Sequence, residues 1–201
     1  MNERLIGLTG FARSGKDTFY NRSKIFLSNK GLKSSRFAFA DVLKSECDLI
    51  LKRHLNISAF TEDSLEKELI RPLLVTWGTE IRRKIDPFCW INAISSPIEE
   101  RIASGEYVFI TDVRFKNEVE WIKSQGGLIF NIKKEGGFPA NKDELDQSKL
   151  IKPLTDINVL WPQFSGDQIQ LCDPYVSRVL NLYFDKNILQ KNLPKWTIYG
   201  K

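Results

Sequence analysis

Residues 10–18 read Gly-Phe-Ala-Arg-Ser-Gly-Lys-Asp-Thr and directly follow the apolar run Leu5-Ile6-Gly7-Leu8-Thr9. An apolar strand that turns sharply into a helix leaves the first amides of that helix without intrahelical partners, so they form an anion site. Gly10 and Gly15 let the backbone wrap an anion without a side chain in the way, and Lys16 can reach the terminal phosphates of a nucleoside triphosphate. Residues 10–18 are therefore predicted to form a phosphate-binding loop, the P loop.

The loop departs from the usual Gly-Lys-Ser/Thr ending, because Asp17 stands where a hydroxyl would contact Mg²⁺ and Thr18 comes one residue later. The Asp17 carboxylate could hold Mg²⁺ directly or through water, since this cation prefers oxygen ligands and keeps several waters. Thr18 would then contact an inner phosphate. The alternative is a glycine-rich turn followed by a helix whose first turn carries Asp17 at the positive end of the helix dipole.

The composition is that of an ordinary globular chain. It has 201 residues, of which 42% are hydrophobic and 27% charged, so one compact domain over 1–201 is expected. The net charge of +5 suits polyanionic ligands, but so small an excess does not imply DNA binding, and no stable nucleic-acid partner is expected. Cys47, Cys89 and Cys172 are odd in number and far apart, which indicates reduced core thiols rather than disulfides or a zinc site.

Membrane and export signals are also missing from the sequence pattern. No apolar stretch approaches the ~20 residues of a membrane span. The N-terminus passes straight into the P loop without a charged-then-apolar leader. A cytoplasmic protein without a membrane partner is therefore expected.

Apolar runs alternate with helical patterns along most of the chain. Strands are expected at 5–9, 36–40, 107–111, 128–132 and 157–160. Helices are expected after the P loop to about Asn29, after a cap at Asp41, over 73–85, from about 88 to 105 with a break at Pro97 left open, and over 117–125 and 174–184. Unbroken apolar runs between helices indicate a buried parallel sheet. The predicted fold is α/β, a three-layer P-loop sandwich with a five-stranded parallel sheet flanked by helices.

Three segments have a different composition. Residues 56–68 are polar and resemble a surface excursion, after which Pro72 fits best as an early residue of the next helix. Residues 133–149 are rich in Gly, Lys, Asp and Glu with little apolar content, which predicts a mobile cover, or lid. Residues 192–201 are expected to form a tail.

Ligands of an open parallel sheet bind beyond the carboxyl ends of its strands, and two further strands deliver polar groups there. Asp41 and Lys44 follow the second strand, and Asp112, Arg114 and Glu118 follow the third. Asp112 stands where many P-loop enzymes keep the acid that orients Mg²⁺, and Arg114 could neutralise charge on a transferred or accepted phosphate. The alternatives are helix caps for the aspartates, a solvated Lys44, and a weak helical ion pair between Arg114 and Glu118.

The helical region after the polar excursion carries a second group of candidates. Arg71 could bind an acceptor phosphate, and Trp90 could stack on a base. The alternatives are that tryptophans belong to the core and that helical arginines are solvated. The other candidates along this region are Trp77, Thr79, Arg82 and Arg83. The lone histidine, His54, is expected at a helix end, and phosphoryl transfer does not require it because positioning and charge neutralisation dominate that chemistry.

Taken in order, these segments resemble the bacteriophage deoxynucleoside monophosphate kinase family over residues 5 to about 132. The resemblance rests on Gly15-Lys16-Asp17-Thr18, on Phe39-Ala40-Asp41 with Leu43-Lys44, on Arg71 with Gly78-Thr79-Glu80, and on Asp112-Val113-Arg114-Phe115 with Asn117-Glu118. It implies a nucleoside monophosphate kinase fold, ATP and Mg²⁺ as donor and cofactor, and a deoxynucleoside monophosphate as acceptor. The protein would then work in the host cytoplasm, if it is phage-encoded.

The chemistry of the P loop and the resemblance together assign expected roles to single residues. The ATP site would comprise Gly10, Ser14, Gly15, Lys16, Asp17, Thr18, Lys133 and Lys134, and Mg²⁺ would be held by Asp17 or Asp112. The acceptor site, largely in the helical region 41–105, would comprise Asp41, Lys44, Arg71, Thr79, Trp90, Asp112, Arg114 and Glu118. Catalysis would rest on Lys16, Arg13, Asp17 and Arg114, with the lid lysines offsetting developing charge.

Two departures from that family affect specificity. Val75 and Trp77 stand where such kinases often carry a glutamine, so the base that is accepted stays open. Lys133 and Lys134 stand where the family's lid has arginine, and lysine supplies charge without a bidentate contact.

Two alternatives to a deoxynucleotide kinase remain. The first is a small-molecule phosphate kinase of the phosphomevalonate type, which has a similar Gly-Lys-Asp loop. The second is a nucleotide-binding regulator or nucleic-acid-associated ATPase. The oligomeric state is not set by the sequence, and a homodimer is left open.

Overall fold

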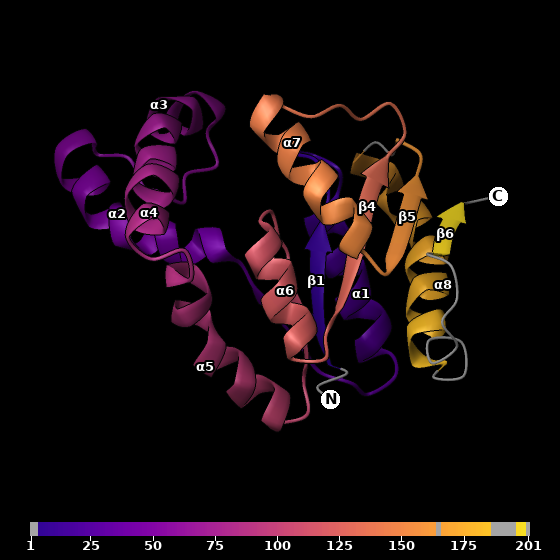
Figure 1. The fold of residues 1–201 in the computed structure, drawn as a ribbon. Helices are drawn as coiled ribbons and strands as arrows, with labels where there is room; N and C mark the ends of the chain where they lie inside the picture. The colour runs from indigo at the N-terminus through magenta and orange to yellow at the C-terminus, as the bar shows by residue number, and fades with distance from the viewer. Residues whose placement is uncertain (1–3, 164–165, 186–195, 200–201) are drawn as a thin grey trace. The chain divides into compact units, whose positions relative to one another are not determined.

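The structure is a computed structural model that describes residues 4–163, 166–185 and 196–199. The chain divides into two compact units. The sheet unit comprises residues 1–36 and 100–201, and the helical unit comprises residues 37–99. Figure 1 labels the α-helices of both units and the strands β1, β4, β5 and β6.

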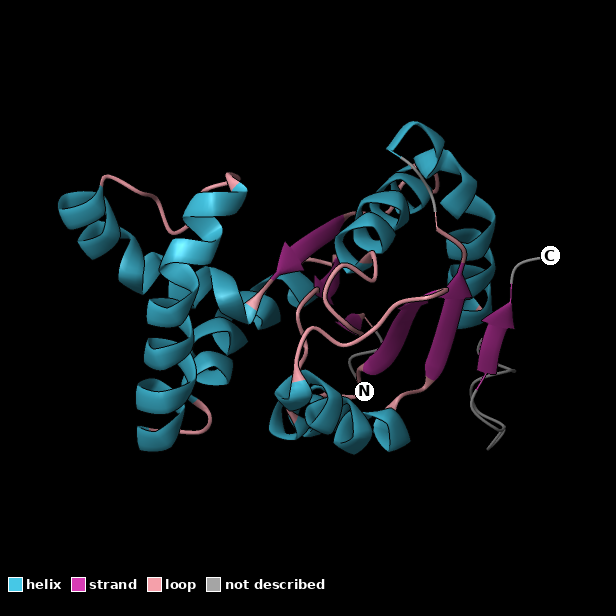
Figure 2. Cartoon of the chain, turned by 90° about the horizontal axis from the view of Figure 1, so that it is seen from above, coloured by secondary structure: helices cyan, strands magenta, loops and turns pink. Residues whose placement is uncertain are grey.

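The sheet unit is built on a six-stranded sheet with the order β2-β3-β1-β4-β5-β6. The strands are β1 (Leu5–Thr9), β2 (Ser34–Phe37), β3 (Tyr107–Ile110), β4 (Leu128–Lys134), β5 (Ile157–Trp161) and β6 (Trp196–Tyr199). β1 pairs in parallel with β3 and β4, β4 with β5, and β5 with β6. The predicted α/β fold with a central parallel sheet is confirmed, and Figure 2 shows the strands seen from above.

The sixth strand was not expected from the sequence. Residues 196–199 of the expected tail form β6, which pairs in parallel with β5 so that Ile157 lies opposite Trp196. The rest of that tail, residues 192–195 and 200–201, lies outside the described residues. The sequence Trp-Thr-Ile-Tyr is rich in β-branched and aromatic residues, and this was the available signal for a strand.

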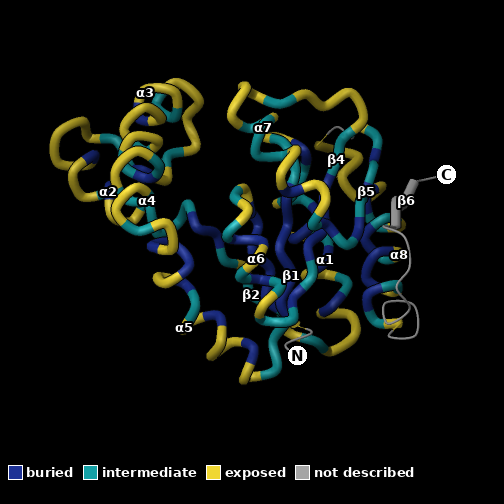
Figure 3. Tube along the Cα trace, in the orientation of Figure 1, coloured by how far each residue is buried: buried dark blue, intermediate teal, exposed yellow. Residues whose placement is uncertain are grey.

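Helices cover both faces of the sheet and complete the three layers. Among the described residues, the helices that lie wholly in this unit are α1 (Lys16–Ser28), α6 (Lys116–Ser124), α7 (Lys142–Ile151), α8 (Asp173–Phe184) and the short 3₁₀ helices η2 (Lys152–Leu154) and η3 (Gly166–Cys172). Ile6 of β1 belongs to one buried cluster with Phe19 of α1 and Val176 of α8. Gly7 faces the other side, where a Cβ would lie 2.8 Å from Ile122 Cδ1 of α6, so that helix packs directly on the strand. Figure 3 shows how deeply β1 is buried between these layers.

The helical unit consists of four helical segments and the start of a fifth. They are α2 (Phe39–Leu55), α3 (Ser64–Val75), the π-helix η1 (Thr76–Arg82), α4 (Arg83–Ile85) and α5 (Cys89–Ala103). Its small core joins Cys47 and Leu51 of α2 to Ile70 of α3. His54 lies in the last turn of α2, as expected. A π-helical stretch of this length is rare, and such widened turns occur often at functional sites.

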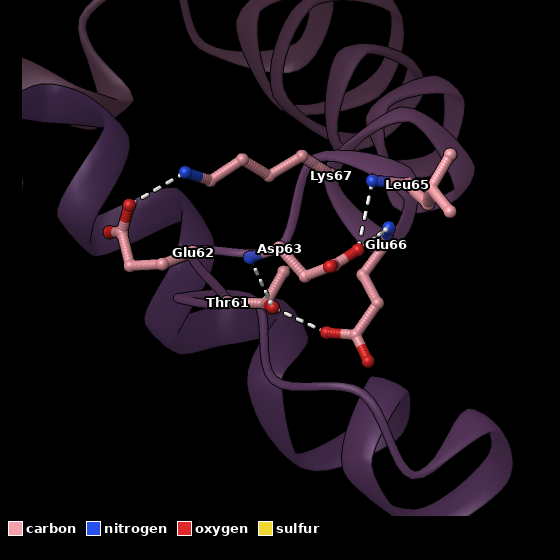
Figure 4. A network of polar contacts seen from close by, with 6 residues as sticks. All are labelled: Thr61, Glu62, Asp63, Leu65, Glu66 and Lys67. Atoms are coloured by element: carbon pink, nitrogen blue, oxygen red, sulfur yellow. Dashed lines mark hydrogen bonds and ion pairs between the residues drawn. The ribbon is translucent and has the colours of Figure 1, made fainter.

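The predicted surface excursion over 56–68 is wrong at its C-terminal end, because α3 begins at Ser64. Figure 4 shows the cause: the Asp63 carboxylate accepts hydrogen bonds from the amides of Leu65 and Glu66 at 2.9 and 3.0 Å. This N-cap starts the helix well before Pro72, which consequently lies inside α3 rather than near its beginning. The proline removes one backbone donor there, and α3 passes into the π-helix a few residues later.

Two other local predictions are wrong, and the structure adds detail at two further places. The strand expected over 36–40 is β2, which ends at Phe37 because residues 39 and 40 already belong to α2. Ala38 is the N-cap of α2, so Asp41 lies within the first helical turn rather than at the cap. α5 runs through Pro97 without interruption. The predicted lid contains a regular helix, α7, whose N-cap is Asn141 with its side chain accepting a hydrogen bond from Glu144 N at 2.8 Å.

The three cysteines are free and buried, as expected. Within the part of the chain that the structure describes, no helix is both long and apolar enough to cross a membrane.

Candidate phosphate-binding site

The P loop lies at the carboxyl end of β1 and requires glycine at two positions. Gly10 has a φ of 137°, and a Cβ there would lie 2.1 Å from Ile132 O. Gly15 has a φ of 91°, and a Cβ there would lie 2.5 Å from Cζ2 of Trp161. Both are left-handed conformations that side chains also block sterically, so a larger residue would displace the loop from its neighbours.

The loop closes on itself and then opens into α1. The amide of Ser14 donates to the carbonyl oxygen of Phe11 at 3.1 Å, and Arg13 adopts a left-handed φ of 60°. Helix α1 begins at Lys16, and Thr18 is half-buried in its first turn. The Ser14 hydroxyl is buried and has no hydrogen-bond partner among the residues that the structure describes. A buried hydroxyl without a partner beside an anion loop fits a site that receives further polar atoms from a ligand.

Trp161 packs against the P loop, and this contact was not predicted from the sequence. Its Nε1 donates to the carbonyl oxygen of Ser14 at 3.0 Å, and the side chain is only 2% exposed. The residue ends β5, one position beyond the strand that was expected over 157–160. Its burial at the carboxyl end of a strand near a glycine loop could not be derived from its position in the sequence.

Lys16 is buried enough that its charged form is destabilised. Its Nζ donates to the carbonyl oxygens of Gly10 and Phe11, both at 2.9 Å. Burial, and then the Arg114 cation, lower the pKa of Lys16 to about 8, while Glu144 and two aspartates oppose the shift. A lysine that has lost hydration in this way gains more from a nearby phosphate than a solvated one does.

Three of the predicted residues, Asp17, Asp112 and Arg114, form one electrostatic group around this lysine. Asp17, Asp112 and Arg114 all act on the Lys16 charge. Asp17 also lies 3.5 Å from Arg36, measured from Oδ1 to Nε. The structure thus places two carboxylates and two cations around the end of the P loop.

Glu118 stabilises the turn that carries Arg114. It is 1% exposed, and its Oε2 accepts hydrogen bonds from the amides of Arg114 and Phe115 at 2.7 and 3.0 Å. The N-cap of α6 is Phe115, so the alternative that made Asp112 a helix cap is wrong. Glu118 therefore fixes the backbone that presents the exposed Arg114 side chain. Whether it also meets the acceptor stays a prediction.

Lys133 and Lys134 end β4, whose residues lie opposite β5 in parallel register. Lys134 lies opposite Trp161, so both lysines belong to the same end of the sheet as the P loop. Burial, and then Lys152, lower the pKa of Lys133.

Glu144 of the lid helix is the second site residue that was not predicted from the sequence. Its Oε1 accepts a hydrogen bond from the P-loop amide of Ala12 at 2.7 Å. Its Oε2 accepts one from Ala140 N at 2.6 Å. An asparagine followed three residues later by glutamate is a helix-start pattern and could have revealed α7, although not its contact with the loop.

The remaining predicted acceptor residues lie in the helical unit. Asp41 and Lys44 are half-buried on α2, Arg71 is exposed on α3, and Thr79 is half-buried in the π-helix. Lys44 Nζ lies 5.5 Å from the ring centroid of Phe60.

Trp90 belongs to the packing of the helical unit. It is 2% exposed, its Nε1 donates to Gly78 O at 3.3 Å, and Arg82 lies 5.4 Å above its ring. Glu46 accepts hydrogen bonds from Trp77 Nε1 at 2.8 Å and from Arg82 Nη2 at 3.1 Å. The burial of Trp90 matches the alternative in which a tryptophan forms core, whereas Trp77 is only partly buried. A stacking role for Trp90 stays a prediction.

Comparison with known proteins identifies one family. A sequence profile of the phosphomevalonate kinase family matches residues 8–127. The phosphomevalonate kinase of Drosophila melanogaster is 26% identical over 127 residues, which are 62% of this chain and 62% of the fly protein. The match therefore spans less than two thirds of that relative's length.

A solved structure is similar as well. The unliganded crystal structure of a sugar kinase from Janibacter sp. HTCC2649 aligns with 92% of this chain and 97% of its own, at 12% identity and a TM-score of 0.44. The profile match includes the P loop and the candidates up to Glu118, and it ends before the lid and Glu144. The matched family is the one that the Gly-Lys-Asp loop left open as an alternative.

Proposed function

The chain belongs to the phosphomevalonate kinase family, and on that basis we propose that it is an ATP-dependent kinase whose acceptor is the phosphate of a small molecule. The observation that carries the proposal is the contact at Ala12. A P-loop amide there already holds an anionic oxygen, the Glu144 carboxylate, at 2.7 Å. A loop that binds a carboxylate through its backbone is shaped for the oxygens of a nucleotide phosphate.

The residues present fit a donor nucleotide with Mg²⁺. Among the described residues there is no group of three or more His, Cys, Asp or Glu side chains that could hold a metal alone. Asp17 and Asp112 nevertheless both act on Lys16, and Mg²⁺ is commonly held by one or two carboxylates together with substrate phosphates. When bound, the ion would neutralise charge on the outer phosphates of the donor.

The chain's own groups account for the rest of the proposed mechanism. Lys16 would turn from the carbonyl oxygens of Gly10 and Phe11 to the terminal phosphates, where its cation regains a charged partner. Arg13 and Arg114 are exposed at the loop and at the end of β3, and would offset charge on the phosphoryl group in transfer. The acceptor phosphate is already ionised, so its oxygen can attack the γ-phosphorus in line without a strong general base. ADP leaves with the displaced oxygen, and the acceptor becomes a diphosphate.

The first acceptor that we propose is of the phosphomevalonate type, because the matched family and the fly relative bear that name. Aromatic rings near the acceptor would favour a nucleobase. Trp90 is instead buried under Arg82, so its ring is less available to stack on a base.

A deoxynucleoside monophosphate is the second candidate. It is favoured by the ordered set Phe39-Ala40-Asp41, Gly78-Thr79-Glu80 and Asp112-Val113-Arg114-Phe115, which resembles the phage kinases.

One experiment separates the candidates. The purified protein is incubated with γ-labelled ATP and Mg²⁺ in parallel with phosphomevalonate and with each deoxynucleoside monophosphate, and the labelled product is identified. Label in a diphosphate product from phosphomevalonate supports the first acceptor, and label in a deoxynucleoside diphosphate supports the second. ADP formation without any labelled small product, stimulated by DNA, would instead indicate a nucleic-acid-associated ATPase.

A further inference from the structure

We propose that Glu144 is an internal competitor of the nucleotide, whose carboxylate takes the place of a phosphate oxygen at the Ala12 amide. The inference rests on the proposed function, because it assumes that this amide belongs to the nucleotide site. α7 lies at the end of the sheet toward which the arrows of β1 and β4 point (Figure 1). The side chain thus joins the lid to the P loop within the sheet unit.

Both carboxylate oxygens of Glu144 are engaged, and each has a separate amide partner. Oε1 accepts from Ala12 N at 2.7 Å, and Oε2 accepts from Ala140 N at 2.6 Å. Donor–acceptor distances this short are typical of hydrogen bonds with one charged partner. The carboxylate therefore bridges the P loop and the segment that precedes α7.

An ordinary capping role does not explain this geometry. Glu144 is the third residue of α7, and in a reciprocal cap its carboxylate would return to the N-cap amide of Asn141. Only the other half of that cap is present, the hydrogen bond from Glu144 N to Asn141 Oδ1. The carboxylate instead contacts the preceding residue, Ala140, and an amide 132 positions away in the chain.

The charges around the P loop agree with an occupied anion site. Burial and Arg114 both disfavour the charged form of Lys16, and Glu144 is the largest contribution that favours it. Lys16 itself donates to the loop carbonyls of Gly10 and Phe11. Glu144 thus supplies negative charge where a nucleotide phosphate would.

A nucleotide must displace Glu144 to reach the Ala12 amide, since the hydrogen of one amide cannot serve two anionic oxygens at full strength. Displacement breaks one charge-assisted hydrogen bond, so the intact carboxylate lowers nucleotide affinity. It also releases the lid helix from the loop. The lid is then free to close over the bound nucleotide in a different position.

The test compares MgADP binding, measured by isothermal titration calorimetry, between the wild-type protein and Glu144→Ala, Glu144→Gln and Asp143→Asn. Asp143 is the matched control, because it is the neighbouring acidic residue in the same first turn of α7. Removal of the competitor should make Glu144→Ala bind MgADP about tenfold more tightly, with Glu144→Gln between it and the wild type. Asp143→Asn should bind like the wild type. If Glu144→Ala does not fold, Glu144→Gln carries the comparison.

Hydrogen exchange gives a second readout without nucleotide. The Ala12 amide should exchange slowly in the wild type and in Asp143→Asn, and at least tenfold faster in Glu144→Ala. Equal MgADP affinity in all four proteins would overturn the competition and leave the proposed function standing. Failure of every protein to bind MgADP or MgATP would overturn the proposed function together with the competition.

Discussion

Trp161 Nε1 donates a hydrogen bond to the carbonyl oxygen of Ser14, so the last residue of β5 holds the backbone of the P loop. The same indole fills the space beside Gly15, where Cζ2 would lie 2.5 Å from a Cβ. One aromatic side chain thus fixes both the position of the loop and the need for glycine in it.

Replacement of Trp161 by phenylalanine should loosen the loop while most of the packing is kept. The buried carbonyl of Ser14 loses its partner, which costs about 1–3 kcal/mol. We expect the KM for ATP to rise several-fold and the midpoint of thermal unfolding to fall by about 2–8 °C. Steady-state kinetics and a thermal melt check this. Trp77→Phe, which removes an indole donor in the helical unit, is the control and should leave the KM for ATP unchanged.

Gly15→Ala should remove nucleotide binding. The new methyl group meets Trp161 in a backbone conformation that side chains rarely adopt, so both the φ angle and the packing oppose it. Gly31→Ala is the matched control, because Gly31 also has a positive φ of 71° but no atom of the described residues lies within 4 Å of its Cβ position. The control should cost only the conformational strain of about 1–2 kcal/mol and keep its affinity for MgADP. Equal losses of affinity in the two variants would contradict the role of the Trp161 contact.

The sequence predicted the fold well because its strongest signals are local. The glycine loop after an apolar strand, and the unbroken runs that became β3, β4 and β5, depend on residues close together in the chain. The predictions that were wrong lie where a short-range sequence signal was overlooked or was judged weaker than a competing one. The Asp63 cap starts α3 early and places Pro72 inside the helix, and the short edge strand β6 was taken for a tail.

The candidate site was predictable only in part, for a related reason. Lys16, Asp17, Asp112 and Arg114 sit at fixed offsets from strand ends, so their grouping follows from the topology. Trp161 and Glu144 are brought to the P loop by β5 and by α7, at sequence separations of 147 and 132 residues. No local pattern in the sequence reports contacts of that kind.

Lys16 should make the stability of the nucleotide-free protein depend on pH. Its pKa is about 8 in the folded state, below the ordinary lysine value of 10.5, so the unfolded chain binds more protons between these two values. Stability from this group therefore rises as pH increases from about 8 to about 10.5, and the burial of the charge costs on the order of 3 kcal/mol below that window.

Lys16→Met should accordingly unfold at a higher temperature than the wild type at pH 7, and the difference should shrink above pH 8. Thermal melts of both proteins between pH 6 and pH 10 measure this. Lys24→Met, at an exposed position of the same helix, should show no such pH-dependent difference. If the difference in unfolding temperature between the wild type and Lys16→Met stayed constant from pH 6 to pH 10, this would contradict an energetic cost of the buried Lys16 charge.

Arg114→Ala should strongly lower kcat and leave the fold intact. Its side chain is exposed at the end of β3, and its backbone amide is held by the buried carboxylate of Glu118 at 2.7 Å. An arginine that offsets charge in phosphoryl transfer contributes roughly 10³–10⁵ in rate, so kcat should fall by at least about 10³. A surface ion pair is worth only about 0–1 kcal/mol, so the midpoint of unfolding should scarcely move.

Arg101→Ala provides the comparison for Arg114, because its exposed side chain pairs with Glu106 at 3.4 Å, at the end of α5. Rapid-quench measurement of labelled product, with saturating ATP and acceptor, should find the control at wild-type rate. Glu118→Gln tests the positioning of Arg114: with the backbone of the turn less firmly held, kcat should fall by a smaller factor while the KM for ATP stays constant. Turnover by Arg114→Ala within threefold of wild type would exclude Arg114 from the transfer step and leave Arg13 and Lys16 to neutralise the charge.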